Sequence, residues 1–292
     1  MDKLIQTLIS GLSLGSIYAL IALGYTMVYG IAKMLNFAHG DIIMVGAYAV
    51  ITAAFTMGLP PFIAILISIA LCALLGIVIE FLAYRPLRQA QPLAVLITAI
   101  GVSYLLQNLA LLIYGSEQKA FPTIVALPTV HIGGVYIDGI TLATLVVTAV
   151  IMVALSLFIN KTRMGKAMRA VSEDKEAAEL MGISVNRTIT VTFAIGSALA
   201  GVAAIFYGAA YTYIRPTTGA MPGIKAFTAA VFGGIGSIPG AFLGGLLLGI
   251  IEAMAQAYIS TNLANSIVFA VLIVVLLVKP AGLLGKSVTE KV

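Results

Sequence analysis

The sequence consists mostly of apolar runs that are long enough to cross a lipid bilayer. A spanning helix needs about 20 apolar residues, and the chain contains apolar blocks at residues 4–31, 41–57, 61–84, 93–114, 140–159, 189–213, 226–259 and 267–278. Each block is apolar throughout, which does not match the alternating pattern of a transmembrane β-strand. We therefore predict an all-α polytopic membrane protein with about eight or nine transmembrane segments. Because the first and seventh blocks are long and rich in glycine, we expect them to contain broken or half helices.

The composition excludes several classes of soluble protein. Of the 292 residues, 61% are hydrophobic and 9% are charged, whereas soluble domains carry about 25% charged residues. A soluble enzyme, a nucleic-acid-binding protein and a disordered chain are therefore excluded. The single cysteine, Cys72, provides no disulfide framework and no metal-ligand spacing. The sequence also lacks a pattern typical of a catalytic site, so we predict neither catalytic nor metal-ligating residues.

The basic residues indicate which loops face the cytoplasm. Arg85 and Arg88 follow the third apolar block, six further basic residues lie in the loop at residues 160–188, and the C-terminal tail is also basic. Lysine and arginine mark cytoplasmic loops, so all three segments are expected inside. The stretch at residues 115–139 then lies outside, where its prolines and glycines favour a hairpin or a capping loop. A short element near residues 223–235 would bring the tail back inside, while the side of the N-terminus stays open.

No soluble domain interrupts the chain, so we treat residues 1–292 as one membrane domain with a polar loop at residues 160–188. Within this loop, Ser172 is a good N-cap, acidic residues follow it, and Gly182 is a good helix terminator. The pattern predicts a short amphipathic helix that either docks into a partner's groove or lies on the membrane surface. In the docking interpretation, the coupling residues are Glu173, Asp174, Glu176, Ala177, Ala178, Leu180 and Gly182.

Two polar or glycine-rich breaks interrupt the apolar blocks. One covers residues 36–41 and the other residues 233–240. Irregular backbone at membrane depth is tolerated where protein or a wet cavity surrounds it, and broken helices recur near transporter substrates. The breaks therefore either flank a translocation path or are interfacial turns. The candidate path or gate residues are Asn36, His39, Gly40, Asp41, Gly233, Gly234, Gly236 and Gly240.

Several ionisable residues near or within the apolar blocks have a structural and a functional interpretation. We expect His39 to be structural and Asp41 to cap the helix that follows it. Glu252 is either a functional intramembrane charge or reaches the interface near the end of its helix. Lys225, like Lys33, is expected to extend to an interface. Glu80 is expected to pair with Arg85.

Longer motifs then resemble one family over essentially the whole chain. They are residues 22–30 (ALGYTMVYG), 35–41 (LNFAHGD), 221–240 (MPGIKAFTAAVFGGIGSIPG) and 277–285 (LVKPAGLLG). Together they resemble the H-type permease subunit of branched-chain amino acid ABC importers. The Glu-Ala-Ala-x-x-x-Gly pattern at residues 176–182 is similar to the loop by which such permeases engage their ATPases, although the downstream Ile-x-Leu-Pro half is absent.

The resemblance implies the ABC importer permease fold and alternating access driven by other subunits. The implied partners are a paralogous M-type permease or a second copy of this chain, two cytoplasmic ATPase subunits, an external amino-acid-binding protein and the lipid bilayer. The resemblance implies a multi-pass location in a bacterial or archaeal plasma membrane, which is the inner membrane of a Gram-negative cell.

No cofactor is expected in this chain. ATP and magnesium would bind to the partners, because residues 280–287 (PAGLLGKS) end like a phosphate-binding loop but lack its first glycine and its following helix. An importer of urea or short amides and an ATP-independent carrier remain the alternatives.

Overall fold

The computed structural model describes residues 2–124, 127–132 and 135–285. Its α-helices are α1 (Asp2–Ala32), α2 (His39–Ile51), α3 (Pro61–Ile79), α4 (Pro92–Tyr114), α5 (Gly139–Lys161), α6 (Arg163–Glu173), α7 (Lys175–Leu180), α8 (Val185–Tyr211), α9 (Ala220–Gly233), α10 (Ile238–Tyr258) and α11 (Ala264–Val278). Two π-helical turns, Thr52–Thr56 and Glu80–Tyr84, extend α2 and α3, and a 3₁₀ turn follows at Arg85–Leu87. The short strands are β1 (Lys119–Ala120), β2 (Val130–Ile132), β3 (Val135–Ile137) and β4 (Tyr213–Ile214).

Within the described residues, seven helices are long and apolar enough to cross a membrane: α1, α2, α3, α4, α5, α8 and α10. The shorter apolar helix α11 and the 14-residue α9 complete the bundle. This agrees with the expected all-α protein of eight or nine segments. The seventh apolar block is divided into α9 and α10, as its glycines predicted.

The expected break in the first apolar block is absent, because α1 is continuous over 31 residues. The glycines of α1 serve packing instead. A Cβ atom on Gly11 would overlap the backbone of Ile250 in α10, and a Cβ on Gly249 would overlap Gly15. Small residues let helices approach closely in lipid, so these glycines allow α1 and α10 to pack closely against each other.

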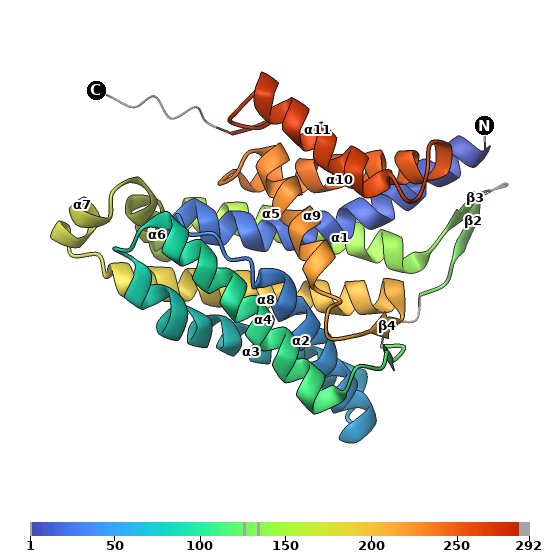
Figure 1. Cartoon of the computed structure of the whole chain (residues 1–292), viewed down its shortest axis with the longest axis horizontal. Coiled ribbons are helices and arrows are strands. Elements are labelled where there is room, and N and C mark those ends of the chain that lie inside the picture. Colours follow the sequence, from blue (N-terminus) through green and yellow to red (C-terminus); the bar gives the residue numbers. More distant parts are fainter. Residues whose placement is uncertain (1, 125–126, 133–134, 286–292) are drawn as a thin grey trace.

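Different elements lie at the two ends of the bundle (Figure 1). The β2–β3 hairpin and the start of α1 lie at one end, and α6 and α7 lie at the other. The N-terminal end of α1 is fixed there by paired hydrogen bonds of 3.1 Å between the amide of Gln6 and the backbone of Tyr136. Because basic loops mark the cytoplasm, the end with α6 and α7 is expected to be the cytoplasmic one. The start of α1 lies at the opposite end, so on this expectation it is external.

The expected hairpin is present in the segment between α4 and α5. Strands β2 and β3 pair antiparallel, with Val130 opposite Ile137. Strand β1 pairs with β4, which directly follows α8. These small sheets join the segment between α4 and α5 to the ends of α1 and α8.

Candidate functional site

The cytoplasmic loop contains two helices in place of the single helix expected from Ser172 to Gly182. Glu173 is the last residue of α6, and Asp174 has an extended backbone that separates α6 from α7. The Asp174 carboxylate accepts hydrogen bonds from the backbone N–H groups of Glu176 (2.9 Å) and Ala177 (3.0 Å). Aspartate caps a helix as well as serine does, so the cap is shifted by two residues. The Ser172 hydroxyl instead donates to the carbonyl of Arg169 at 2.7 Å.

Helix α7 has one buried and one exposed apolar side. Ala178 is buried, whereas the side chains of Leu180 and Met181 are 89% and 82% exposed. Gly182 follows with a φ of +80°, a left-handed conformation that glycine adopts without strain. Two large apolar side chains therefore project from the cytoplasmic tip of the molecule, at the turn that ends α7.

Positive charge gathers beside α7. Burial, together with the positive charges of Arg88 and Lys33, lowers the pKa of Lys175. The guanidinium of Arg88 is already paired, because it donates hydrogen bonds to Glu80 and to Asn186. Glu80 also accepts a 2.7 Å hydrogen bond from Thr190. The expected partner Arg85 instead lies over the ring of Phe81, so the predicted Glu80–Arg85 pair is wrong.

The first break lies within the protein. Helix α1 ends at Ala32, and α2 begins at His39. Asn36 is buried, and its amide oxygen accepts a 3.0 Å hydrogen bond from the hydroxyl of Tyr84. At Asn36 this irregular backbone is therefore surrounded by protein, the setting in which broken helices are tolerated in membrane proteins.

His39 and Gly40 fit the start of α2 against neighbouring helices. The buried His39 ring lies 4.6 Å from the ring of Tyr25, measured between centroids. A Cβ atom on Gly40 would overlap Gly219 and contact Gly223 at the start of α9. The first break is thus packed directly on the short helix α9.

Asp41 does not cap α2, contrary to the expectation from its position after a break. The N-cap is Ala38, which offers no side-chain hydrogen bond. The Asp41 carboxylate instead accepts hydrogen bonds from Gln107 (3.0 Å) and Ser103 of α4. Asp41 already lies in the first turn of α2, so its side chain is directed at the neighbouring helix.

The second break lies between α9 and α10. Gly234 and Gly236 have φ values of +107° and +91°. A 3.2 Å hydrogen bond from the backbone N–H of Gly240 to the Ser237 hydroxyl caps α10. The structure brings this break to the end of α1, because Gly236 packs on Gly30. Both breaks therefore adjoin α9, one at each of its ends.

The C-terminal segment covers the second break. The backbone N–H groups of Leu283 and Leu284 donate 2.9 Å hydrogen bonds to the carbonyls of Phe232 and Gly233. These carbonyls belong to the last turn of α9, where the helix itself supplies no donors. The motif at residues 277–285 thus supplies hydrogen-bond donors to the last turn of α9.

A buried ion pair joins α9 to α10. The Nζ atom of Lys225 lies 2.6 Å from Oε1 of Glu252. The Glu252 carboxylate also accepts 3.1 Å hydrogen bonds from the Tyr18 hydroxyl and the Gln256 amide. Lys225 does not extend to an interface as expected, because α9 packs between α1, α2 and α10 and an opposite charge lies within reach. In the sequence, this pair is indicated by two opposite charges in successive apolar segments.

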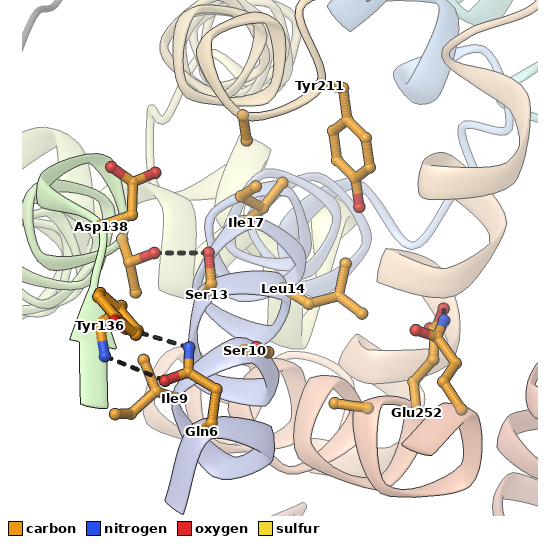
Figure 2. Close-up of a pocket in the computed structure, with 14 residues that line it drawn as sticks. Gln6, Ile9, Ser10, Ser13, Leu14, Ile17, Tyr136, Asp138, Tyr211 and Glu252 are labelled. Carbon is orange, nitrogen blue, oxygen red and sulfur yellow. Dashed lines mark hydrogen bonds between the residues drawn. The ribbon is translucent and has the colours of Figure 1, made fainter. Parts of the chain in front are cut away.

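An open cleft of about 430 Å³ lies at the external ends of α1, α5, α8 and α10, beside the hairpin. Figure 2 shows Asp138 and Glu252 on opposite sides of it, with side chains of α1 between them. Sequence analysis missed the cleft, although a polar stripe on α1 marks it. The stripe consists of Gln6, Ser10 and Ser13, spaced as neighbours on one helix face.

Comparisons with known proteins complete these observations. The sequence model of the family described as "Branched-chain amino acid transport system / permease component" matches residues 7–277. The high-affinity branched-chain amino acid transport system permease protein BraD of Pseudomonas aeruginosa is 47% identical over 300 residues, which cover 99% of this chain and 98% of that protein. The permease protein LivH of Escherichia coli K12, from a system of the same description, is 46% identical over 307 residues, covering 99% and 97%. A chain of PsaBC from Streptococcus pneumoniae, solved in complex with Fab, aligns with a TM-score of 0.46 and 18% identity, covering 94% of this chain and 90% of that chain.

Proposed function

The chain belongs to the family of branched-chain amino acid transport permease components, and on this premise we infer that it is the membrane-spanning subunit of an ATP-driven importer of branched-chain amino acids. The observation that supports this inference most strongly is the 47% identity to BraD over nearly the full length of both chains. The protein is a transport subunit and not an enzyme. It is a multi-pass protein of the bacterial inner membrane. The resemblance drawn from the sequence motifs is confirmed.

A permease component of such a system acts with ATPase subunits and an amino-acid-binding protein. We propose that two ATPase subunits bind its cytoplasmic side, with ATP and magnesium held by them. The second permease position is filled by an M-type paralogue or by another copy of this chain. The binding protein docks at the external end, where the hairpin and the cleft lie.

We propose that α6 and α7 form the coupling element. The exposed Leu180 and Met181 supply an apolar tip for a groove of the ATPase. Ala178 is buried, and α6 packs on α1 and α8. A push on the α7 tip would therefore be transmitted to two membrane-spanning helices.

The two breaks are proposed as the gates that respond to this push. Helix α9 has one break packed against its start and the other at its end, through Gly40 and Gly236. A short helix with irregular backbone at both ends can shift without bending a regular helix. Alternating access would then arise from movement of α9 relative to α1 and α2.

Uptake of leucine in membrane vesicles that contain the candidate partners tests this function. Wild type is expected to show ATP-dependent, vanadate-sensitive uptake and to retain the ATPase during purification. Glu176→Lys and Gly182→Pro are expected to lose both properties. Glu117→Lys, an exposed change on the external side, is the control that should keep the ATPase bound. Uptake by this chain alone without ATP would contradict the proposal in favour of a secondary carrier.

A further inference from the structure

The external cleft has a marked charge preference. Among the described residues that line it, two are carboxylates, Asp138 and Glu252, and none is lysine or arginine. Glu252 is only 3% exposed and is paired with Lys225, whereas Asp138 has no ion-pair partner among the described residues. An open cleft whose uncompensated charge is a carboxylate attracts a positively charged group.

The size and the remaining lining suit a small amphipathic molecule. A volume of about 430 Å³ falls within the range of pockets that enclose small ligands, roughly 300 to 1,000 Å³. Ile9, Leu14 and Ile17 add an apolar wall from α1. A compact aliphatic side chain fits such a wall, while an ammonium group faces the carboxylates.

Polar donors lie between the two carboxylates. The hydroxyls of Ser10 and Tyr211 border the cleft, and within the described part of the chain neither has a hydrogen-bond partner. Figure 2 shows the Tyr211 hydroxyl directed toward the space between α1 and α10. Such hydroxyls can donate to the carboxylate of a zwitterion.

The Glu252 carboxylate is held in a fixed position. Its carboxylate is held by Lys225, Tyr18 and Gln256. A carboxylate fixed by several donors in the ground state does not need to reorganise when a cation arrives. Lys225 does not line the cleft, so the group that α10 presents to it is the Glu252 carboxylate, although Lys225 offsets part of its charge.

From these observations we propose that the cleft binds the zwitterion of an α-amino acid with an aliphatic side chain, with its ammonium group directed at Asp138 and Glu252. The cleft would be the permease's own external substrate site, where amino acid leaving the binding protein is first held. This inference rests on the proposed function, because it assigns a site to the substrate of that importer.

Cysteine labelling gives a direct test, because Cys72 is the only cysteine of the chain and is buried. Ser10→Cys places a thiol in the cleft, and Ser13→Cys places one a turn further along α1. Thr261→Cys, in the exposed external turn between α10 and α11, is the control. Each variant is assembled into the complete importer and labelled with a membrane-impermeant maleimide.

The ligand series isolates the ammonium group. Leucine at about ten times its dissociation constant should slow labelling in the cleft about tenfold by mass action. The α-keto acid 4-methyl-2-oxopentanoate keeps the side chain and carboxylate but lacks the ammonium group, so it should give no protection. Labelling at Thr261→Cys should be the same with every addition. Equal protection by the keto acid, protection by sodium chloride alone, or no protection by leucine would each overturn the proposal.

Charge variants separate binding from structural support. Asp138→Asn and the double variant Lys225→Met/Glu252→Gln are combined with Ser10→Cys, and both should reduce protection by leucine. The double variant removes the negative charge without leaving a lone buried lysine. Full protection in an assembled double variant would show that Glu252 serves only the packing of α9 on α10, which contradicts the proposal.

The two hypotheses fail in different ways. If the wild-type importer takes up leucine with ATP but leucine never protects the cleft cysteines, the cleft assignment is wrong and the importer function stands. If uptake of leucine is absent or independent of ATP in the complete assembly, the proposed function itself is wrong.

Discussion

Lys225 and Glu252 form an ion pair across the contact of α9 with α10, with Nζ of Lys225 2.6 Å from Oε1 of Glu252 and both side chains buried. The pair lies in a chain where only 9% of residues are charged. It connects a short helix that adjoins two backbone breaks to a full membrane span. The position of α9 therefore depends on an electrostatic contact in addition to apolar packing.

The first prediction concerns the stability of this contact. Glu252→Ala leaves the lysine charge buried without a partner, which should destabilise the protein by about 3–5 kcal/mol. Lys225→Met/Glu252→Met replaces the pair with apolar groups and should cost much less. Thermal unfolding of the purified protein in detergent measures the difference, with Glu117→Gln on the exposed external segment as the control. A double variant as unstable as Glu252→Ala would contradict this account.

The second prediction concerns the contact of α1 with α10. In Gly249→Ala, the added methyl group would overlap the backbone of Gly15, and overpacking of this kind typically costs about 1–3 kcal/mol. Gly101→Ala on α4 is the matched control, because nothing lies within 4 Å of its Cβ position. Alanine is a better helix former than glycine by about 1 kcal/mol, so the control should be neutral or stabilising. The melting temperature of Gly249→Ala should therefore fall, while that of Gly101→Ala should stay the same or rise.

The features of this structure differ in how far the sequence predicts them. The spans follow from apolar length, the membrane sides from basic loops, and the breaks from polar or glycine-rich interruptions. The cross-helix pairs could not be predicted in the same way. The partners of Glu80 and Asp41 are Arg88 and Gln107, and these choices depend on how the helices rotate against each other.

Helical rotation is poorly specified here by the apolar pattern. In a membrane helix both the lipid-facing and the protein-facing sides are apolar, so periodicity indicates little about which residues face inward. The polar stripe at Gln6, Ser10 and Ser13 is the exception, because it marks the side of α1 that borders the cleft. Polar spacing within apolar helices therefore indicates which helix face is turned to the cleft.

The third prediction concerns the cap of α7. Asp174→Ala removes the acceptor of two backbone N–H groups, which should destabilise α7 by about 1 kcal/mol. Ser172→Ala should have little effect, because that hydroxyl bonds within α6. Hydrogen exchange at residues 175–180 measures the local opening, and co-purified ATPase measures coupling. Asp174→Asn should keep both the protection of α7 and the bound ATPase. Equal effects of Asp174→Ala and Ser172→Ala would show that Asp174 is not the cap of α7.

The last prediction concerns the second break. Gly236 has a φ of +91°, and the Cβ of an alanine there would lie 3.7 Å from the Cα of Gly30, so the space is sufficient but the backbone is strained. Strain of this kind costs on the order of 1–3 kcal/mol. Gly58→Ala is the matched control, since Gly58 also has a positive φ, at +63°, with nothing within 4 Å. If the break moves during transport, Gly236→Ala should lower leucine uptake in an importer that still assembles, while Gly58→Ala should leave uptake near the wild-type rate. Equal uptake by both variants would mean that the break is a fixed turn and that the gate lies elsewhere.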